Sequence, residues 1–129
     1  MDTVQETSTL IAASKVKGTD VFNTGGDRVG SIYDLMIDKQ TGQVAYAIMS
    51  FGGFLGVWNS YHPLPWSLLQ YNTNFGGYIV DIKQSQLEDA PSYDAGAEPS
   101  WGDPDYERKL HEYYGVKPAP GQIRRPVIR

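Results

Sequence analysis

Turn-forming residues interrupt the chain at short intervals between Leu10 and Leu87. The segments between them are rich in β-branched and aromatic residues, a pattern typical of short strands joined by tight turns. Residues 23–27 and 38–42 predict two of these turns, because glycine and asparagine accept the positive φ that tight hairpins need. The spacing therefore predicts a small all-β domain over residues 10–91.

Five segments within this domain have the composition of strands. Residues 44–51 form a nearly continuous apolar run, which predicts a strand that is buried on both faces at the centre of a sheet. Pro63 and Pro65 each remove a backbone donor, so their segment is expected to be extended or at an edge. The predicted strands are 14–22, with a bend near Gly18, then 29–37, 44–51, 61–66 and 78–82, with helical turns at 67–69 and 85–90.

Composition is that of a soluble globular protein. Of the 129 residues, 40% are hydrophobic and 20% are charged, which is too apolar for a disordered chain and too polar for a membrane protein. Residues 1–8 lack the basic region of a signal peptide, and no apolar run approaches the roughly 18 residues that span a bilayer. We therefore expect a cytoplasmic protein without membrane insertion, with a flexible N-terminus over residues 1–9.

Few residues offer catalytic or metal chemistry, and the absence of cysteine excludes thiolate nucleophiles and cysteine-ligated metals. His62 and His111 have neither a metal-ligand spacing nor an activated serine beside them, which favours structural or surface roles. Asp34 and Asp38 could share a strand face as a carboxylate pair, although a solvated barrel face is the simpler interpretation. Residues 52–56 are glycine-rich but are followed by neither the lysine nor the helix of a phosphate site. The sequence therefore predicts no enzyme activity, no cofactor and no metal site.

The composition changes again at residue 92. Residues 92–104 are rich in Ala, Gly, Pro, Ser and Asp and predict a linker. Asp103 or Asp105 can cap a short helix over residues 106–114, which is marginal alone and is expected to pack on the barrel or on a second subunit. Residues 117–129 contain three prolines and are expected to form a basic, extended tail.

Charge is distributed unevenly along the chain. The net charge is −4, but residues 1–116 hold all fifteen acidic and seven of the basic side chains, a net charge of −8. Residues 117–129 hold four basic side chains and no acid. Because an acidic surface repels phosphate groups, nucleic acid is not favoured as a partner of the barrel.

Aromatic residues are denser than a core of this size requires. Several lie in or near the expected loop after residue 51, and others lie in the C-terminal segment. Exposed aromatic patches mark protein-binding surfaces, so self-packing and a contact surface both stay open as interpretations. The candidate binding residues are Phe54, Leu55, Val57, Trp58, Tyr61, Trp66, Trp101, Tyr106, Tyr113 and Tyr114.

Several segments together resemble the stand-alone bacterial PRC-barrel domain. They are residues 18–21, 29–32, DKQTGQVAYAIMSF at 38–51, the glycine-rich 52–56 and YHPLPW at 61–66. The resemblance covers residues 6–91, and WGDPDYERKLHEYYGV at 101–116 resembles an extension common in such proteins. This family is related to the H subunit of photosynthetic reaction centres and to the C-terminal domain of RimM ribosome-maturation factors. The resemblance implies a small six-stranded barrel that docks to other macromolecules, without a conserved catalytic constellation.

Three functional hypotheses follow. The first is a non-enzymatic protein-interaction or scaffolding module that binds another protein or itself, as a homo-oligomer, through barrel edges or the aromatic residues. The second is a factor associated with the ribosome or with RNA maturation, based on the resemblance and the basic tail. The third is a small-molecule or cation site near Asp34, Asp38 and His62.

Overall fold

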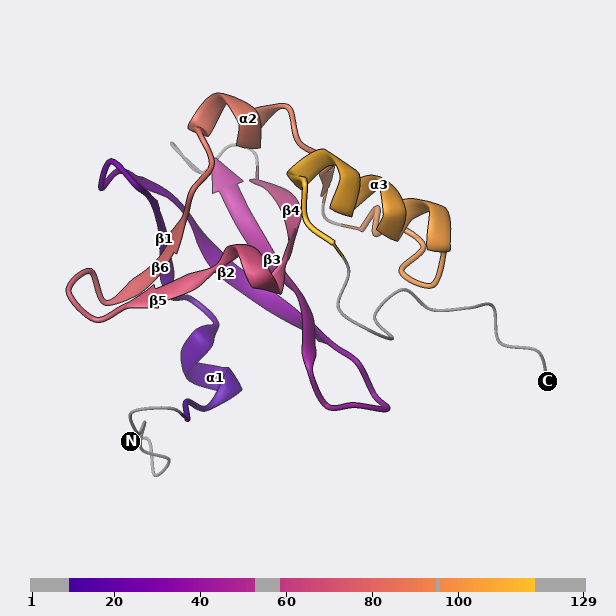
Figure 1. Ribbon diagram of the computed structural model, residues 1–129, viewed down its shortest axis with the longest axis horizontal. Coiled ribbons are helices and arrows are strands. Elements are labelled where there is room, and N and C mark those ends of the chain that lie inside the picture. The colour runs from indigo at the N-terminus through magenta and orange to yellow at the C-terminus, as the bar shows by residue number, and fades with distance from the viewer. Residues whose placement is uncertain (1–9, 53–58, 95, 118–129) are drawn as a thin grey trace.

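The structure, a computed structural model, describes residues 10–52, 59–94 and 96–117 (Figure 1). In chain order its elements are α1 (Ala13–Val16), β1 (Asp20–Asn23), β2 (Arg28–Ile37), β3 (Val44–Gly52), β4 (Asn59–Pro65), the 3-10 turn η2 (Trp66–Leu68), β5 (Gln70–Asn72), β6 (Gly77–Val80), α2 (Gln84–Glu88), β7 (Tyr93–Asp94) and α3 (Pro104–Tyr114). The predicted all-β class with a C-terminal helix is confirmed.

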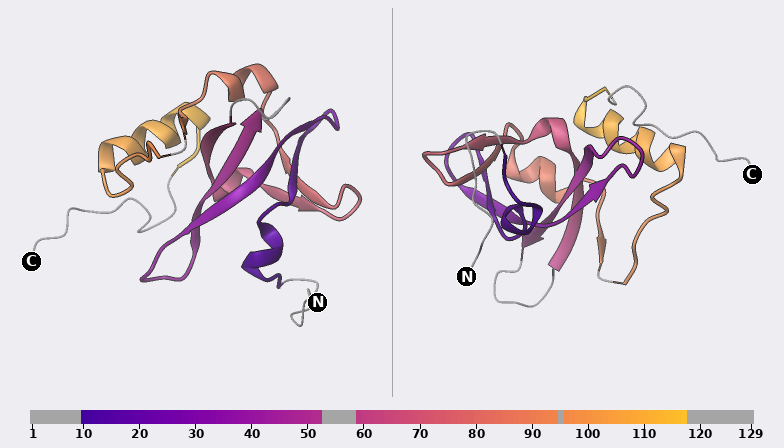
Figure 2. Two further views of the ribbon diagram at one scale, coloured as in Figure 1. Left: turned by 180° about the vertical axis from the view of Figure 1, so that it is seen from behind. Right: turned by 90° about the horizontal axis from the view of Figure 1, so that it is seen from below.

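All of these strands belong to one sheet, in the order β5-β6-β1-β2-β3-β4-β7. Neighbouring strands are antiparallel except β1 and β6, which are parallel. The sheet curls around its core, as the two views of Figure 2 show. Within the described residues the end strands β5 and β7 do not pair with each other, so the sheet is not closed. It has seven strands, where the resemblance implied a six-stranded barrel.

The β2–β3 hairpin forms where the turn residues predicted it. Asp38 Oδ1 accepts the backbone N–H groups of Gln40 and Thr41, at 2.8 and 3.2 Å, and so shapes the loop. Gly42 adopts a φ of 77°, which costs glycine little. Gly30 is needed in β2 for a different reason, because a Cβ there would lie 2.5 Å from the carbonyl oxygen of Ser50.

The core lies on the inner face of the sheet. Ile32 in β2, Ala47 and Met49 in β3, and Leu64 in β4 are each at most 1% exposed. Together with residues from α1, β1, β6 and α2 they form one apolar cluster, which stabilises the fold by removing this surface from water. The cluster consists of Val16, Val21, Val29, Ile32, Ala47, Met49, Leu64, Leu69, Tyr78, Val80, Ile82 and Leu87.

Helix α3 covers part of the outer face of the same sheet. Tyr46 and Ile48 alternate with the core residues of β3, so they point to the opposite face, yet each is only 2% exposed. α3 packs against β4 beside them (Figure 2). Its Leu110 is fully buried. The helix therefore docks on the barrel of its own chain, one of the two alternatives that the sequence left open.

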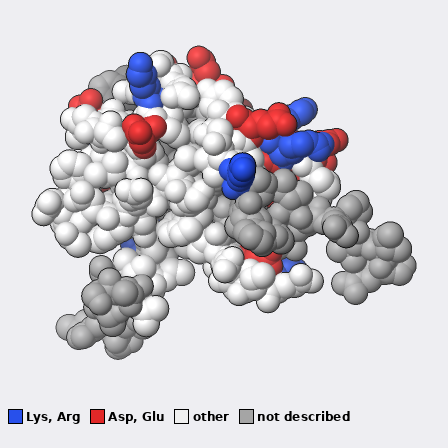
Figure 3. All heavy atoms as spheres, in the orientation of Figure 1, with Lys and Arg blue, Asp and Glu red and all other residues white. Residues whose placement is uncertain are grey.

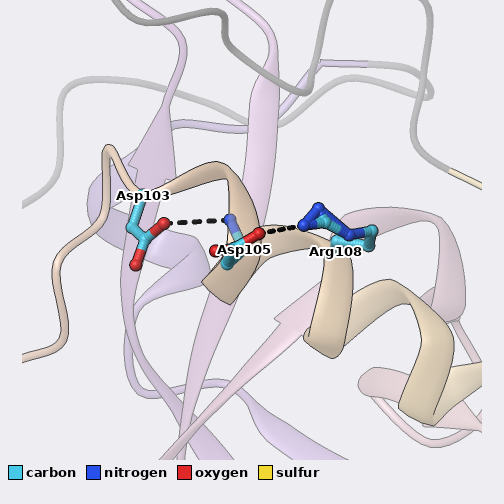
Figure 4. A network of polar contacts seen from close by, with 3 residues as sticks. All are labelled: Asp103, Asp105 and Arg108. Atoms are coloured by element: carbon cyan, nitrogen blue, oxygen red, sulfur yellow. Dashed lines mark hydrogen bonds and ion pairs between the residues drawn. The ribbon is translucent and has the colours of Figure 1, made fainter.

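Local capping sets the ends of α3. The side chain of Asp103 accepts the N–H of Asp105 at 2.9 Å, and Asp105 also pairs with Arg108 (Figure 4). Asp103 is therefore the N-cap, and the helix begins at Pro104, two residues before the predicted start. At the other end Gly115 adopts a φ of 66°, which ends the helix.

Several local predictions need correction. Residues 13–16 form helix α1 rather than part of a strand, because Gly18, with a φ of 86°, turns the chain before β1 starts. The short strands β5 and β7 were not predicted, and β7 lies within the segment expected to be a linker. The central strand is β2, and the predicted central strand, β3, is its neighbour.

Pro63 and Pro65 lie in an extended segment, as the sequence predicted. β7 pairs only with Ser60 and Tyr61 of β4. Pro63 and Pro65 therefore lie in the part of β4 that pairs with a strand on one side only. On the side that faces β7, no strand of the described chain pairs with these two prolines, so no hydrogen bond between strands is lost there.

Candidate interaction surface

Three tyrosines form a continuous strip across the outer face of the sheet. The ring centroids of Tyr33 and Tyr61 are 4.4 Å apart, and those of Tyr61 and Tyr93 are 5.5 Å apart. Tyr33 is 50% exposed, whereas Tyr61 and Tyr93 are less exposed and partly buried. We call these residues the tyrosine strip. It is the part of the outer face where large aromatic rings reach solvent beside one another.

Strand register explains how the strip forms. Tyr33 and Tyr61 belong to β2 and β4, which are separated by β3. The residue of β3 in register with Tyr61 is Ser50, which in turn pairs with Ser31 of β2. Both serines are small, so the two tyrosine rings can meet above them.

Trp101 connects the strip to the C-terminal helix. Its ring centroid lies 6.0 Å from that of Tyr93, 6.2 Å from Tyr46 and 6.0 Å from Tyr106. Burial, reinforced by Glu98, raises the pKa of Tyr93 to about 12, and burial raises the pKa of Tyr106 to about 12. The hydroxyls of Tyr93 and Tyr106 are therefore uncharged near neutral pH, and these two residues contribute packing and hydrogen-bonding surface rather than charge.

The candidate residues from the sequence divide into three groups. Tyr61, Trp101 and Tyr106 belong to the aromatic network just described. Four others lie outside the described residues, and their role stays a prediction. They are Phe54, Leu55, Val57 and Trp58.

The third group packs within the fold, away from the strip. Trp66 contacts the ring of Tyr78 edge-to-face at 5.5 Å and packs against the core. Tyr113 donates its hydroxyl to the carbonyl oxygen of Gln86 at 2.6 Å, which joins α3 to α2. Tyr114 packs against the core cluster, and burial raises the pKa of its hydroxyl. These three residues act in packing and in holding the tail helix.

Two members of the strip were not among the predicted binding residues. Tyr33 was assigned to the strand over residues 29–37, but the register of β2 and β3 shifts between Ile32 and Asp34, so Tyr33 lies at an irregularity that simple alternation along the strand does not predict. Tyr93 lies in a segment rich in turn residues, where no periodic signal indicates a strand. Its position depends on the pairing of β7 with β4, which is a long-range contact.

A cavity lined mostly by apolar atoms lies between the β2–β3 hairpin and the start of α3. Its volume is about 270 Å³, and two of its lining residues are carboxylates, Asp38 at 8% exposure and Glu107 at 3%. Beside it His111, 4% exposed, places its Nε2 3.2 Å from the hydroxyl of Tyr46. Burial lowers the pKa of His111, and the backbone of Val116 opposes this shift. The lining residues are Met36, Ile37, Asp38, Lys39, Ala45, Tyr46, Trp101, Gly102 and Glu107.

His62 and Ser60 form the only serine–histidine contact among the residues that the structure describes. His62 Nε2 lies 3.1 Å from Ser60 Oγ, and the ring packs edge-to-face on Phe51 at 5.2 Å. Burial lowers the pKa of His62 to about 4, and its Nδ1 has no hydrogen-bond partner within the described chain. A catalytic histidine is oriented by a third group at that nitrogen. The contact therefore has the character of core packing.

The residues of the proposed cation site do not gather into a metal-binding group. Asp34 accepts the N–H of Leu35 and lies 4.0 Å from the ammonium of Lys17, whereas Asp38 shapes the hairpin loop. His62 contacts Ser60 and an aromatic ring. In residues 10–52, 59–94 and 96–117 no three acidic or histidine side chains are placed to hold a metal ion.

Charge is unevenly distributed over the face of the molecule that Figure 3 shows. Charged side chains are most frequent over α3 and along the upper edge, whereas the area over β5 and β6 is nearly free of charge. That hairpin carries a second pair of exposed aromatic residues, Tyr71 at 43% exposure and Phe75 at 44%. Because Tyr71 is exposed nearly as much as Tyr33 but lies in the edge strand β5, three strands away from β2, it offers a matched control for the tyrosine strip.

Comparison with known proteins identifies one family. The family model described as PRC-barrel domain matches residues 8–87, which is most of the predicted domain. No curated protein matches the chain. No helix in the described parts of the chain is long and apolar enough to cross a membrane.

Proposed function

Because the chain belongs to the PRC-barrel domain family, we propose that it is a non-enzymatic protein-interaction module that assembles with a second copy through the tyrosine strip. The observation that carries this proposal is the half-exposed ring of Tyr33, which lies in a row with Tyr61 and Tyr93, neighbouring rings being tilted by 39° and 36°. Tyrosine is enriched at the centres of protein interfaces because it combines a large apolar ring with a polar hydroxyl.

The tail aromatics support this choice by elimination. Trp101, Tyr106, Tyr113 and Tyr114 contact other residues of their own chain and are all half-buried. They are therefore engaged in attaching α3, whereas Tyr33 still presents half of its surface to solvent.

Interface size indicates which other residues contribute. A stable protein interface buries about 800 Å² on each partner. A fully buried tyrosine contributes at most about 150 to 250 Å², and two of the three rings in the strip are already half-buried. Additional apolar surface is needed, and residues 53–58 join β3 to β4 just before Tyr61. Phe54, Leu55, Val57 and Trp58 supply that surface in this proposal.

Surroundings of the two histidines support a non-enzymatic role. Both are buried, and neither Nδ1 has a hydrogen-bond partner among the described residues. Burial lowers the pKa of both. A general base that works near neutral pH has a pKa close to 7 and an oriented imidazole.

Association with RNA is less favoured by the charge of the folded part. The described residues carry thirteen acidic and eight basic side chains, a net charge of −5. Such a surface repels phosphate groups, so any nucleic-acid contact would fall to residues 118–129. Ribosome co-sedimentation at low salt that disappears when residues 117–129 are removed would favour this alternative over self-assembly.

The test is the oligomeric state of the full chain and of two matched variants. Light scattering after size exclusion, at about 10 to 200 μM, is expected to show a dimer for the full chain. Tyr33→Ser is expected to weaken the dimer at least tenfold, whereas Tyr71→Ser, which removes a similarly exposed ring elsewhere, is expected to leave it unchanged. A monomer at all concentrations, or equal weakening by both variants, contradicts the proposal.

A further inference from the structure

The strand β5 lies at one end of the sheet and carries none of the usual protection of an edge. Among the described strands it pairs with β6 alone, and the hairpin that the two strands form projects from the sheet at the left of Figure 1. Exposed edges are normally blocked by charged residues, proline or a bulge. Residues 69–73 contain no charged residue and no proline, and the register of β5 and β6 is regular. The outer edge of β5 is therefore suited to pair with a further strand.

The absence of charge extends far beyond this strand. Residues 40–80 contain no aspartate, glutamate, lysine or arginine. The area over β5 and β6 is correspondingly nearly free of charge in Figure 3. A charged segment would find no opposite charge on these two strands and would lose part of its hydration. The chemistry of this edge therefore favours an uncharged partner.

Aromatic rings flank the edge on both faces of the sheet. Tyr71 is in register with Tyr78 of the core cluster, and their rings meet edge-to-face at 5.3 Å, so Tyr71 lies on the core side. The ring of Phe75 lies 5.2 Å from that of Phe22, and a Cβ on Gly77 would lie 3.1 Å from the Phe22 ring. Since Gly77 and Tyr78 are consecutive in β6, Phe22 and Phe75 lie on the opposite face. Tyr71 and Phe75 are 43% and 44% exposed, so each ring can accept a further side chain.

Hydrogen bonds within the β5–β6 loop hold Phe75 in place. The side chain of Asn72 accepts the N–H groups of Asn74 and Phe75, at 2.8 and 3.2 Å. The N–H of Gly76, which has a φ of 66°, donates to the carbonyl oxygen of Asn72 at 2.9 Å. The ring is therefore positioned before a partner arrives, which lowers the entropic cost of binding.

The length of β5 favours a flexible segment over a second folded copy. Three residues of strand span about 10 Å. Two copies that met through β5 alone would bury less than the roughly 800 Å² per partner of a stable interface. An extended segment can instead follow the edge and contact Tyr71 on one face and Phe75 on the other.

We propose that β5 binds an uncharged, extended segment of another protein by strand addition. Main-chain hydrogen bonds to the outer edge of β5 supply the affinity, and Tyr71 and Phe75 select apolar side chains that alternate along the segment. This site is separate from the tyrosine strip, since β5 and β2 are three strands apart. The proposal therefore stands independently of self-assembly.

The probe is a synthetic, end-capped peptide of residues 76–82, because it contains β6, the strand that β5 already accepts on its other edge. In an NMR titration of the ¹⁵N-labelled full chain, the peptide is expected to shift the amides of residues 70–75 with a Kd below about 0.5 mM. At about 1 mM peptide, hydrogen exchange of the residue 70–73 amides is expected to slow at least twofold. A peptide with Ile79→Pro, which disrupts the strand, is expected not to bind.

Two variants separate this site from the tyrosine strip. Tyr71→Ser removes the ring on the core side of the edge and is expected to weaken peptide binding at least threefold. Tyr33→Ser, the matched control, is expected to leave peptide binding unchanged, the reverse of the order expected for self-assembly. Unchanged positions of the core amides verify that both variants fold.

Three outcomes overturn the proposal. Unshifted amides of residues 70–75 with the peptide show that β5 does not accept a further strand. Equal binding of the Ile79→Pro peptide shows that main-chain pairing is not the source of affinity. Equal weakening of peptide binding by Tyr71→Ser and Tyr33→Ser shows that the peptide does not recognise this edge.

Discussion

Leu110→Ala tests whether the tail helix is held by its own barrel. Leu110 is the fully buried apolar residue of α3, and the other buried side chains of that helix, Glu107 and His111, are polar. An isolated helix of 11 residues is marginal in water, so α3 depends on this contact with the sheet. The substitution removes three carbons, worth about 2.4 kcal/mol at about 0.8 kcal/mol each. The cavity left behind raises the expected loss to about 3 kcal/mol.

Urea unfolding followed by far-UV circular dichroism measures the total loss in free energy of unfolding. Hydrogen exchange of the α3 amides measures local detachment of this helix from the sheet. If α3 opens as a separate unit, its amides are expected to exchange at least tenfold faster in Leu110→Ala while the β2 and β3 amides stay protected. Lys109→Ala is the control, because this exposed neighbour in the same helix is expected to change stability by less than about 0.5 kcal/mol.

Two results would refute the reasoning. A loss in free energy of unfolding below about 1 kcal/mol, with unchanged hydrogen exchange of the α3 amides, would show that the attachment of α3 does not depend on the burial of Leu110 against the sheet. A stability difference between Leu110→Ala and Lys109→Ala that shrinks as the protein is diluted would show that the helix packs on a second copy, since dilution removes an intermolecular contact from both variants.

Three further predictions concern pH, backbone approach and helix attachment. Burial holds the pKa of His62 at about 4, below its usual 6.5, so the folded state resists protonation. The free energy of unfolding, measured in urea, is therefore expected to be highest above pH 6.5 and to fall by about 2 to 3 kcal/mol between pH 7 and pH 4.5. His62→Gln is expected to show a smaller fall. Gly30→Ala is expected to lower the free energy of unfolding by about 1 to 3 kcal/mol, because its Cβ would meet the backbone of β3. Gly102→Ala, where nothing lies within 4 Å, is expected to be neutral in the same urea titration. Tyr113→Phe removes the hydrogen bond to Gln86, and thermal unfolding is expected to report a loss of about 0.5 to 1.5 kcal/mol.

Local chemistry made the central part of the fold predictable. Residues 29–37 and 44–51 are rich in β-branched and apolar residues, and a turn of appropriate composition separates them. The strands β2 and β3 start and end within one residue of these ranges. Propensity, pattern and turn chemistry agree here, and such agreement is what makes a segment specify its structure.

Long-range contacts explain where sequence analysis failed. β7 consists of two residues, and its extended form depends on pairing with Ser60 and Tyr61, more than thirty positions earlier. α1 is a single helical turn, and its Val16 joins the core only because the chain turns at Gly18. Neither pairing nor burial of this kind leaves a periodic signal over so few residues.

The candidate site was predictable in kind but not in detail. An excess of aromatic residues predicted a binding surface, and of the predicted residues Tyr61 belongs to the tyrosine strip for which we propose that role. Which aromatic residues stay exposed depends on where α3 docks. The helical spacing of Tyr106, Tyr113 and Tyr114 did not indicate that Glu107 and His111 are buried as well. Charged and histidine side chains are expected at the surface unless a specific partner is known.

Helix α3 and the tyrosine strip divide the outer face of the sheet between them. α3 and Trp101 occupy the end near the β2–β3 hairpin, where the cavity lies, and the tyrosine strip occupies the part that α3 leaves uncovered. Trp101 contacts both regions, through Tyr46 and Tyr106 on one side and Tyr93 on the other. Docking of α3 therefore restrains the tryptophan against which Tyr93 packs. A rigid Tyr93 loses less side-chain entropy when a second chain covers the strip, so docking of α3 favours the assembly that we propose.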